Sequence, residues 1–197
     1  MATYLALRDR RLQGGVPARP RLQIINTDAS SPLTMAFAGI NSVVRTAGKI
    51  HTIFILCHGY AGENTRGRVC MDAGGMGLQL GRENVLHSNV SLWGAIKDKA
   101  QNIVVYACAA SNTERGNEYT TADGRYLMGA LAIYTNADVF AADRIQWYSK
   151  FNNLPNGRFE WGGWEGRLLH FPPSGGRPAG VARPPVEFAD VMSGSAP

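Results

Sequence analysis

A chain of 197 residues, 45% of them hydrophobic and 18% charged, has enough apolar material for the core of one globular domain. No stretch approaches the roughly 18 uncharged apolar residues that a membrane-spanning helix needs, and the N-terminal residues lack the order of regions typical of a secretory signal. We therefore expect a cytoplasmic protein with no membrane partner, and the sequence leaves export by another route open. The net charge of +5 comes mostly from scattered arginines, so we also expect no nucleic acid partner.

Apolar, β-branched runs alternate with helical patterns along the chain, and this alternation predicts an α/β domain with a mainly parallel sheet. Strands are expected at 22–26, 51–57, 102–108, 138–143 and 166–171. Helices are expected at 30–48, 88–99 and 120–137. The glycine-rich stretch 60–81 contains two short runs, RVCMD and GLQL, which favour a small inserted β-hairpin. Strands joined by right-handed crossovers have their carboxyl ends at one edge of the sheet.

The two ends of the chain are expected to lie outside this core. Residues 1–20 are interpreted as an N-terminal extension, 21–171 as the folded domain and 172–197 as a C-terminal tail rich in Pro and Gly. The last segment holds six of the ten prolines, a composition typical of linkers. Within it, the stretch VEFADVM could dock on a surface or on a partner.

The three cysteines, Cys57, Cys70 and Cys108, are an odd number, which argues against a disulfide framework. No CxxC or HxxxH spacing occurs, so we expect no metal site. The stretch GGMGLQLG lacks the lysine of a phosphate-binding loop and follows no long buried strand, so we expect no nucleotide cofactor. Cys57 is interpreted as a small buried hydrophobe.

Two of the expected strands end on a reactive side chain beside small residues. The run ILC is followed by His58 and Gly59, and the run VVYA is followed by Cys108. Ligands of open α/β sheets bind outside the carboxyl ends of the strands, and neighbouring strands lie about 4.8 Å apart. If these two strands are neighbours, the imidazole can draw the proton from the thiol. The backbone N–H groups of Gly59 and Cys108 could then hold a developing oxyanion.

A strand ending in His-Gly and a later strand ending in Ala-Cys resembles the caspase-like (clan CD) cysteine peptidases. This group includes caspases, metacaspases, gingipains, separases and short bacterial caspase-related domains, of which the last are the most similar. Cys108 follows His58 by 50 residues, and the caspase separation is also about 50. The similarity covers roughly 20–171 and includes the segments 77–111 and 124–147.

The resemblance implies a three-layer caspase-like sandwich with a mainly parallel central sheet, flanking helices and a small inserted hairpin. It implies a bacterial cysteine endopeptidase, a hydrolase that acts on protein or peptide substrates without a cofactor. His58 would be the general base or acid, Cys108 the nucleophile, and the Gly59 and Cys108 backbone the oxyanion donors. At the position of the caspase signature Q-A-C-[RQG]-G, this sequence instead has Tyr106-Ala107-Cys108-Ala109-Ala110. No third catalytic residue is visible in the sequence.

Asp143 ends the strand expected at 138–143, where related enzymes build the pocket for the residue before the scissile bond. A carboxylate there would favour cleavage after Arg or Lys, and Trp147 could form a wall of that pocket. The structural alternatives are that Asp143 pairs with Arg144 or caps a turn, and that Trp147 belongs to the core.

The competing interpretation is a catalytically weak caspase-like pseudoenzyme that acts as a protein-interaction module, with the tail or the 60–81 hairpin as its contact surface. An α/β-hydrolase is less favoured, because its G-x-[SC]-x-G elbow is absent from the stretch YACAA. His51, His87 and His170 are interpreted as structural or exposed. The sequence leaves open whether a dimer or an activating partner is required.

Overall fold

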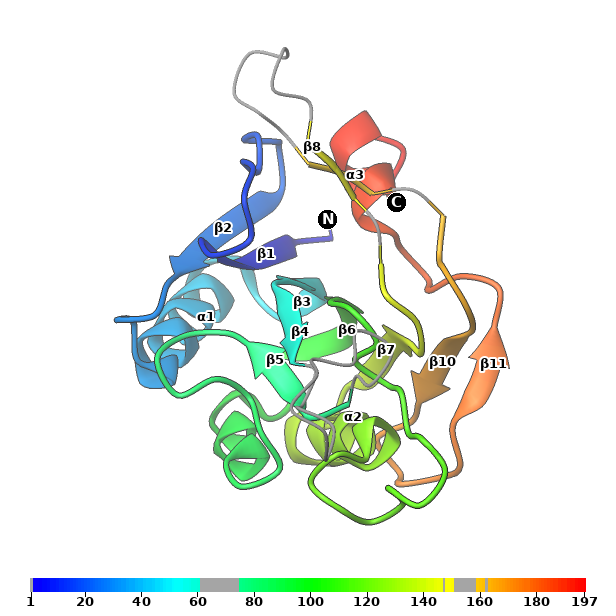
Figure 1. Cartoon of the computed structure of the whole chain (residues 1–197). Helices are drawn as coiled ribbons and strands as arrows, with labels where there is room; N and C mark the ends of the chain where they lie inside the picture. The colour runs from blue at the N-terminus through cyan, green and yellow to red at the C-terminus, as the bar shows by residue number, and fades with distance from the viewer. Residues whose placement is uncertain (1, 61–74, 147, 151–158, 162) are drawn as a thin grey trace.

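The structure is a computed structural model that describes residues 2–60, 75–146, 148–150, 159–161 and 163–197 (Figure 1). Seven strands form its central sheet, in the order β11-β10-β7-β6-β3-β1-β2. Their bounds are Tyr4–Asp9 (β1), Leu22–Thr27 (β2), Ile50–Leu56 (β3), Ala100–Tyr106 (β6), Asp138–Ala142 (β7), Leu168–Phe171 (β10) and Ala179–Val181 (β11). Strands β1, β2, β3, β6 and β7 run parallel to one another. The predicted α/β class with a mainly parallel sheet is confirmed.

The predicted strand at 166–171 forms as β10, but it runs antiparallel to β7, and β11 runs antiparallel to β10. The carboxyl end of β10 therefore lies at the opposite edge of the sheet from those of β3 and β6, which corrects the expectation of one common edge. A parallel pair needs a long crossover connection, usually a helix. Between β7 and β10 the described residues contain only two short strands, β8 (Tyr148–Lys150) and β9 (Phe159–Trp161).

Helices cover both faces of the sheet and give the protein three layers (Figure 1). The helices α1 (Leu33–Ala47) and α2 (Gly124–Thr135) and the 3-10 helix η1 (Val90–Ile96) pack on one face, and α3 (Phe188–Ser193) packs on the other. Alternate residues of β3 divide between these layers: Ile53 and Ile55 contact the first, and Phe54 and Leu56 contact the second. Burial on both faces explains why the strand is a continuous apolar run.

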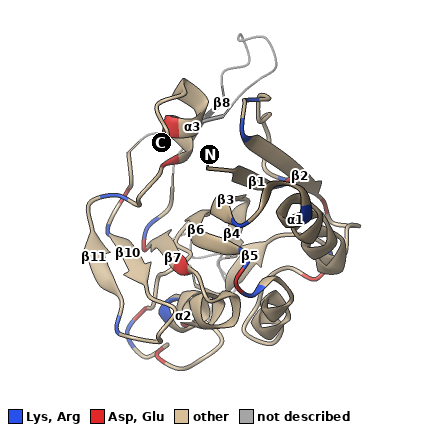
Figure 2. Cartoon of the chain, turned by 180° about the vertical axis from the view of Figure 1, so that it is seen from behind, with Lys and Arg blue, Asp and Glu red and all other residues tan. Residues whose placement is uncertain are grey.

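The sequence predicts neither a membrane nor a nucleic acid as a partner, and the fold can be compared with both predictions. No helix in the described part of the chain combines the length and the apolar character needed to cross a membrane. Among the described residues, Lys and Arg are distributed over many elements rather than along one stripe (Figure 2). That the protein has no nucleic acid partner stays a prediction.

The first strand of the sheet, β1, lies inside the segment that we expected to be an N-terminal extension. It pairs with both β2 and β3, and Tyr4 and Leu7 are fully buried. The predicted boundary at residue 20 is therefore wrong. The run YLAL is short and is followed at once by the charged residues 8–11, which hid its strand character. Of those charged residues, Asp9 is buried at the end of β1, where its carboxylate accepts hydrogen bonds from Arg11.

The segment 172–197, expected to be a tail, is also part of the fold. It supplies β11 and α3, and its residues Val186, Phe188 and Val191 are buried on the face of the sheet opposite α1. The Tyr4 hydroxyl donates a hydrogen bond of 2.6 Å to the backbone oxygen of Pro197, so the two chain ends are joined. A composition rich in proline concealed this role, although Glu187 and Asp190 form a capping box that marks the start of α3.

We expect Phe188→Ala to lower the free energy of unfolding by about 3–5 kcal/mol, because it removes a large buried ring from the second layer. The Phe188 ring lies edge-on to Phe54 with their centroids 5.6 Å apart, and its side chain is only 2% exposed. Urea denaturation followed by circular dichroism measures the effect. Ser174→Ala, an exposed position in the same segment, should change stability by less than about 0.5 kcal/mol. A similar small effect for Phe188→Ala would mean that α3 does not dock on the sheet in solution.

A separate two-stranded sheet follows β3. Strand β4 (His58–Tyr60) pairs antiparallel with β5 (Gly77–Gln79). The GLQL run of the predicted hairpin is therefore a strand, but its partner is the stretch that begins at His58. The RVCMD run, including Cys70, lies outside the described residues.

Candidate active site

His58 and Cys108 follow two adjacent parallel strands of the central sheet. Strands β3 and β6 pair in a register that places Leu56 opposite Tyr106, and each candidate residue comes two positions later. Both side chains therefore leave the sheet at the same edge, and both are half-buried. No other strand lies between them. The two residues therefore lie on neighbouring strands at one edge of the sheet, and their catalytic roles stay predictions.

Gly59 lies directly against the backbone of Cys108. A Cβ atom at Gly59 would overlap the carbonyl oxygen of Cys108 and would lie 2.9 Å from its carbonyl carbon and 3.1 Å from its nitrogen. Only glycine permits this approach, because the atoms that would be met belong to the backbone and cannot rotate away. The pairing of β4 with β5, with His58 opposite Gln79, holds this segment in place.

The chain turns sharply after Cys108. Ala109 has a φ of 47°, which is uncommon for a residue with a Cβ atom. Its N–H donates to the carbonyl of Arg144 at 2.8 Å, and the N–H of Ser111 donates to that of Ala142 at 3.1 Å. The turn is thus fixed to the end of the neighbouring strand β7. Strained backbone of this kind often accompanies a functional site.

The thiol of Cys108 has a backbone acceptor in the structure. Its Sγ lies 3.7 Å from the carbonyl oxygen of Gln146. The Gln146 side chain is buried and donates from Nε2 to the carbonyl oxygens of Arg144 and Glu165, at 2.9 and 3.0 Å. Gln146 therefore joins the segment after β7 to the segment before β10 beside the candidate nucleophile. No short motif marks this residue, because Glu165 and Cys108 lie 19 and 38 residues away from it in the chain.

Tyr148 is a second residue of this region that the sequence did not indicate. Burial raises the pKa of the Tyr148 phenol, and the Cys108 sulfur adds a smaller contribution in the same direction. Tyr148 begins β8, directly after Trp147, which lies outside the described residues.

Asp143 is buried at the end of β7, next to the turn after Cys108. Its carboxylate accepts hydrogen bonds from the backbone N–H and the Nε of Arg167, at 2.8 and 2.9 Å. Of the two alternatives considered for this residue, an ion pair is present, but the partner is Arg167 rather than Arg144. The Arg167 side chain is 67% exposed. A basic substrate side chain would have to displace that guanidinium to reach Asp143.

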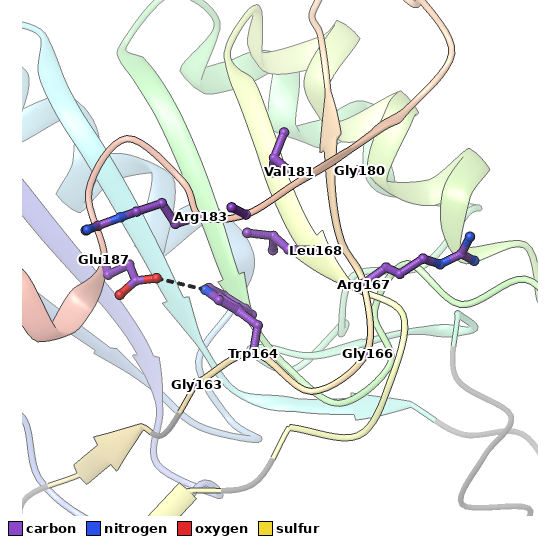
Figure 3. Close-up of a pocket in the computed structure, with 10 residues that line it drawn as sticks. Gly163, Trp164, Gly166, Arg167, Leu168, Gly180, Val181, Arg183 and Glu187 are labelled. Atoms are coloured by element: carbon purple, nitrogen blue, oxygen red, sulfur yellow. Dashed lines mark hydrogen bonds between the residues drawn. The ribbon is translucent and has the colours of Figure 1, made fainter.

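A cavity of about 600 Å³ lies next to the end of β6, on the side of the sheet that α3 covers (Figure 3). The Trp164 ring forms one wall and stacks on Tyr106 with their centroids 4.7 Å apart. Its Nε1 donates to Glu187 at 3.0 Å. Tyr106 precedes Cys108 by two residues, and neither of the two lines the cavity. The lining residues are Gly163, Trp164, Gly166, Arg167, Leu168, Gly180, Val181, Ala182, Arg183 and Glu187.

The other reactive side chains have the structural surroundings that we expected. Cys57 is buried, and burial raises the pKa of its thiol, so it stays protonated. His51 is the second residue of β3, at the opposite edge, and His170 pairs with Asp138 at 2.6 Å. The His87 ring stacks on Tyr126. Within the described ranges, no group of three or more His, Cys, Asp or Glu side chains is arranged to hold a metal ion.

Comparison with known proteins finds no family model that matches this chain and no curated protein that matches it. A functional assignment therefore depends on the arrangement of the residues described above.

Proposed function

We propose that this protein is a cysteine endopeptidase of the caspase-like type, in which His58 and Cys108 form a catalytic dyad. The observation that supports this proposal is the register of β3 and β6, which delivers the two residues to one edge of the sheet from adjacent strands. The close approach of Gly59 to the backbone of Cys108 is a second support, since it holds the segment that carries His58 directly against the segment that carries the candidate nucleophile.

In the proposed reaction, His58 takes the proton from the Cys108 thiol and the thiolate attacks the carbonyl carbon of the scissile peptide. The oxyanion that forms accepts hydrogen bonds from the backbone N–H groups of Gly59 and Cys108, each worth about 3–4 kcal/mol of transition-state stabilisation. The imidazolium then protonates the leaving amine as the C–N bond breaks. A water molecule, deprotonated by His58, hydrolyses the remaining thioester and restores the thiol.

One contact favours the alternative of a catalytically weak protein that binds partners. The Cys108 thiol is directed to the carbonyl oxygen of Gln146, an acceptor that suits a protonated sulfur. Rotation about the Cα–Cβ bond of Cys108 would turn the sulfur away from that acceptor. We interpret the Gln146 contact as a resting arrangement that substrate binding releases.

We expect peptides with Arg or Lys before the scissile bond to be cleaved at least about ten times more efficiently than peptides with Asp there, because a buried carboxylate at Asp143 favours a basic partner. Initial rates with matched Arg, Lys and Asp reporter peptides measure this preference. Asp143→Asn should reduce it, and Arg167→Ala should strengthen it by freeing the carboxylate. Asp138→Asn, at the other end of β7, is the matched control. Equal rates for the three peptides, or a preference for Asp, would rule out this role for Asp143.

A further inference from the structure

Strand β1 ends on a buried carboxylate at the same edge of the sheet as His58 and Cys108. Arg8 pairs with Leu56 of β3, so Asp9 lies beside Cys57, the residue that joins β3 to β4. Asp9 is fully buried. Its oxygens accept from the Nε and Nη2 of Arg11, both at 2.8 Å, and from the Arg11 backbone N–H at 3.0 Å. Burial acts to raise the pKa of Asp9, but these hydrogen bonds outweigh it and lower the pKa below its usual value, so the carboxylate stays charged.

The pair of Asp9 and Arg11 holds both polar backbone groups of Gly81. The N–H of Gly81 donates to Asp9 at 2.9 Å, and its carbonyl oxygen accepts from the Arg11 Nη2 at 2.8 Å. Gly81 has a φ of 67°, and a Cβ atom there would lie 2.9 Å from the carbonyl oxygen of Ser31. Arg11 also donates to the side chain of Asn84 at 3.3 Å. The position of the chain at Gly81 is therefore fixed from several directions.

Gly81 is connected to the candidate general base by a short path. It follows Gln79, the last residue of β5, by two positions, and Gln79 is the partner of His58 in the pairing of β4 with β5. These two strands form a sheet of their own that is separate from the central one. Contacts that anchor β5 to the end of β1 therefore help to determine where His58 lies relative to Cys108.

We propose that Asp9 and Arg11 are positioning residues that hold His58 within reach of Cys108 by fixing Gly81 and β5. This inference rests on the proposed function, since it assigns a role through the dyad. A buried ion pair adds little stability compared with apolar residues of the same size, so stability alone is a weak reason for placing a charged pair at this edge. In this role the pair acts through Gly81 and β5, and not by contact with the Cys108 sulfur or with the substrate.

The test measures the pH dependence of alkylation of Cys108 by iodoacetamide, with the modified residue identified by peptide mass spectrometry. In the unaltered protein the midpoint should lie below the value of about 8.5 for a free thiol, because His58 favours the thiolate. In Arg11→Met we expect the midpoint to rise by about one pH unit toward that of His58→Ala. With peptide substrates, kcat should fall at least about tenfold while KM changes by less than about twofold.

Arg82→Met is the matched control, because Arg82 is next to Gly81 but its exposed side chain pairs with Glu83. It should leave the alkylation midpoint unchanged. If Arg11→Met does not fold, Arg11→Lys, which keeps the charge and loses the forked geometry, should give an intermediate shift. A midpoint equal to that of the unaltered protein in either folded variant would overturn the positioning role. A midpoint in His58→Ala equal to that of the unaltered protein would instead overturn the dyad, and the positioning role with it.

Discussion

Cys108→Ala is expected to lower kcat/KM for peptide hydrolysis by at least about 10³-fold, because it removes the only atom that can attack the substrate in the proposed reaction. It should also prevent labelling by a peptide that carries a thiol-reactive group. The change removes one half-buried sulfur atom, so the fold should be retained and the melting temperature should shift by only a few degrees. Hydrolysis of a fluorogenic peptide and thermal denaturation measure the two effects.

Cys57→Ala is the matched control for this experiment. Cys57 lies in the core, and its pKa is raised by burial, so it should not react with the reagent. We expect this variant to keep its activity and to lose about 1 kcal/mol of stability, because a small cavity replaces the sulfur. Labelling that persists in Cys108→Ala, or that maps to Cys57 or Cys70, would contradict the assignment of the nucleophile.

Gly59→Ala has the second largest expected effect, since the new methyl group would overlap the carbonyl oxygen of Cys108. The two segments would have to move apart, which should cost about 1–3 kcal/mol of stability. The shift would displace His58 and the oxyanion donors relative to Cys108, and a misplacement of about 1 Å reduces a rate about 10²-fold. Urea denaturation and peptide hydrolysis report the two quantities.

Gly94→Ala provides the comparison, because a Cβ atom at Gly94 meets nothing within 4 Å. It should change stability by less than about 0.5 kcal/mol and leave activity unchanged. If Gly59→Ala behaves in the same way, the segments at His58 and Cys108 do not pack together as described, and the geometric support for the dyad is lost.

The parts of the fold that could be predicted from the sequence are those whose local pattern and burial agree. Strands β3 and β6 are continuous apolar runs because helices cover both of their faces. Strand β1 and the segment with α3 could not be recognised in the same way. The first is a short run beside charges. The second is rich in proline, and its residues Val186 and Phe188 are buried against residues far away in the chain, such as Phe54.

The same distinction applies to the candidate site, where the sequence identifies some residues and not others. His58 and Cys108 could be identified because each ends a recognisable strand, and the order of strands in the sheet makes them neighbours. Gln146 and the pair of Asp9 with Arg11 could not, since they act through backbone groups such as Gly81, which lies 72 residues from Asp9. Hydrogen bonds of this kind depend on the register and curvature of the folded chain, which no short motif encodes.

The most direct test is a crystal structure of the protein after reaction with a peptidyl ketone inhibitor. The proposal predicts a covalent bond from Cys108 Sγ to the inhibitor, with the His58 imidazole within about 4 Å of that sulfur or of the inhibitor oxygen. The N–H groups of Gly59 and Cys108 should point at the oxygen that stands for the oxyanion. An unmodified Cys108, or an imidazole turned toward the opposite side of the sheet, would contradict it.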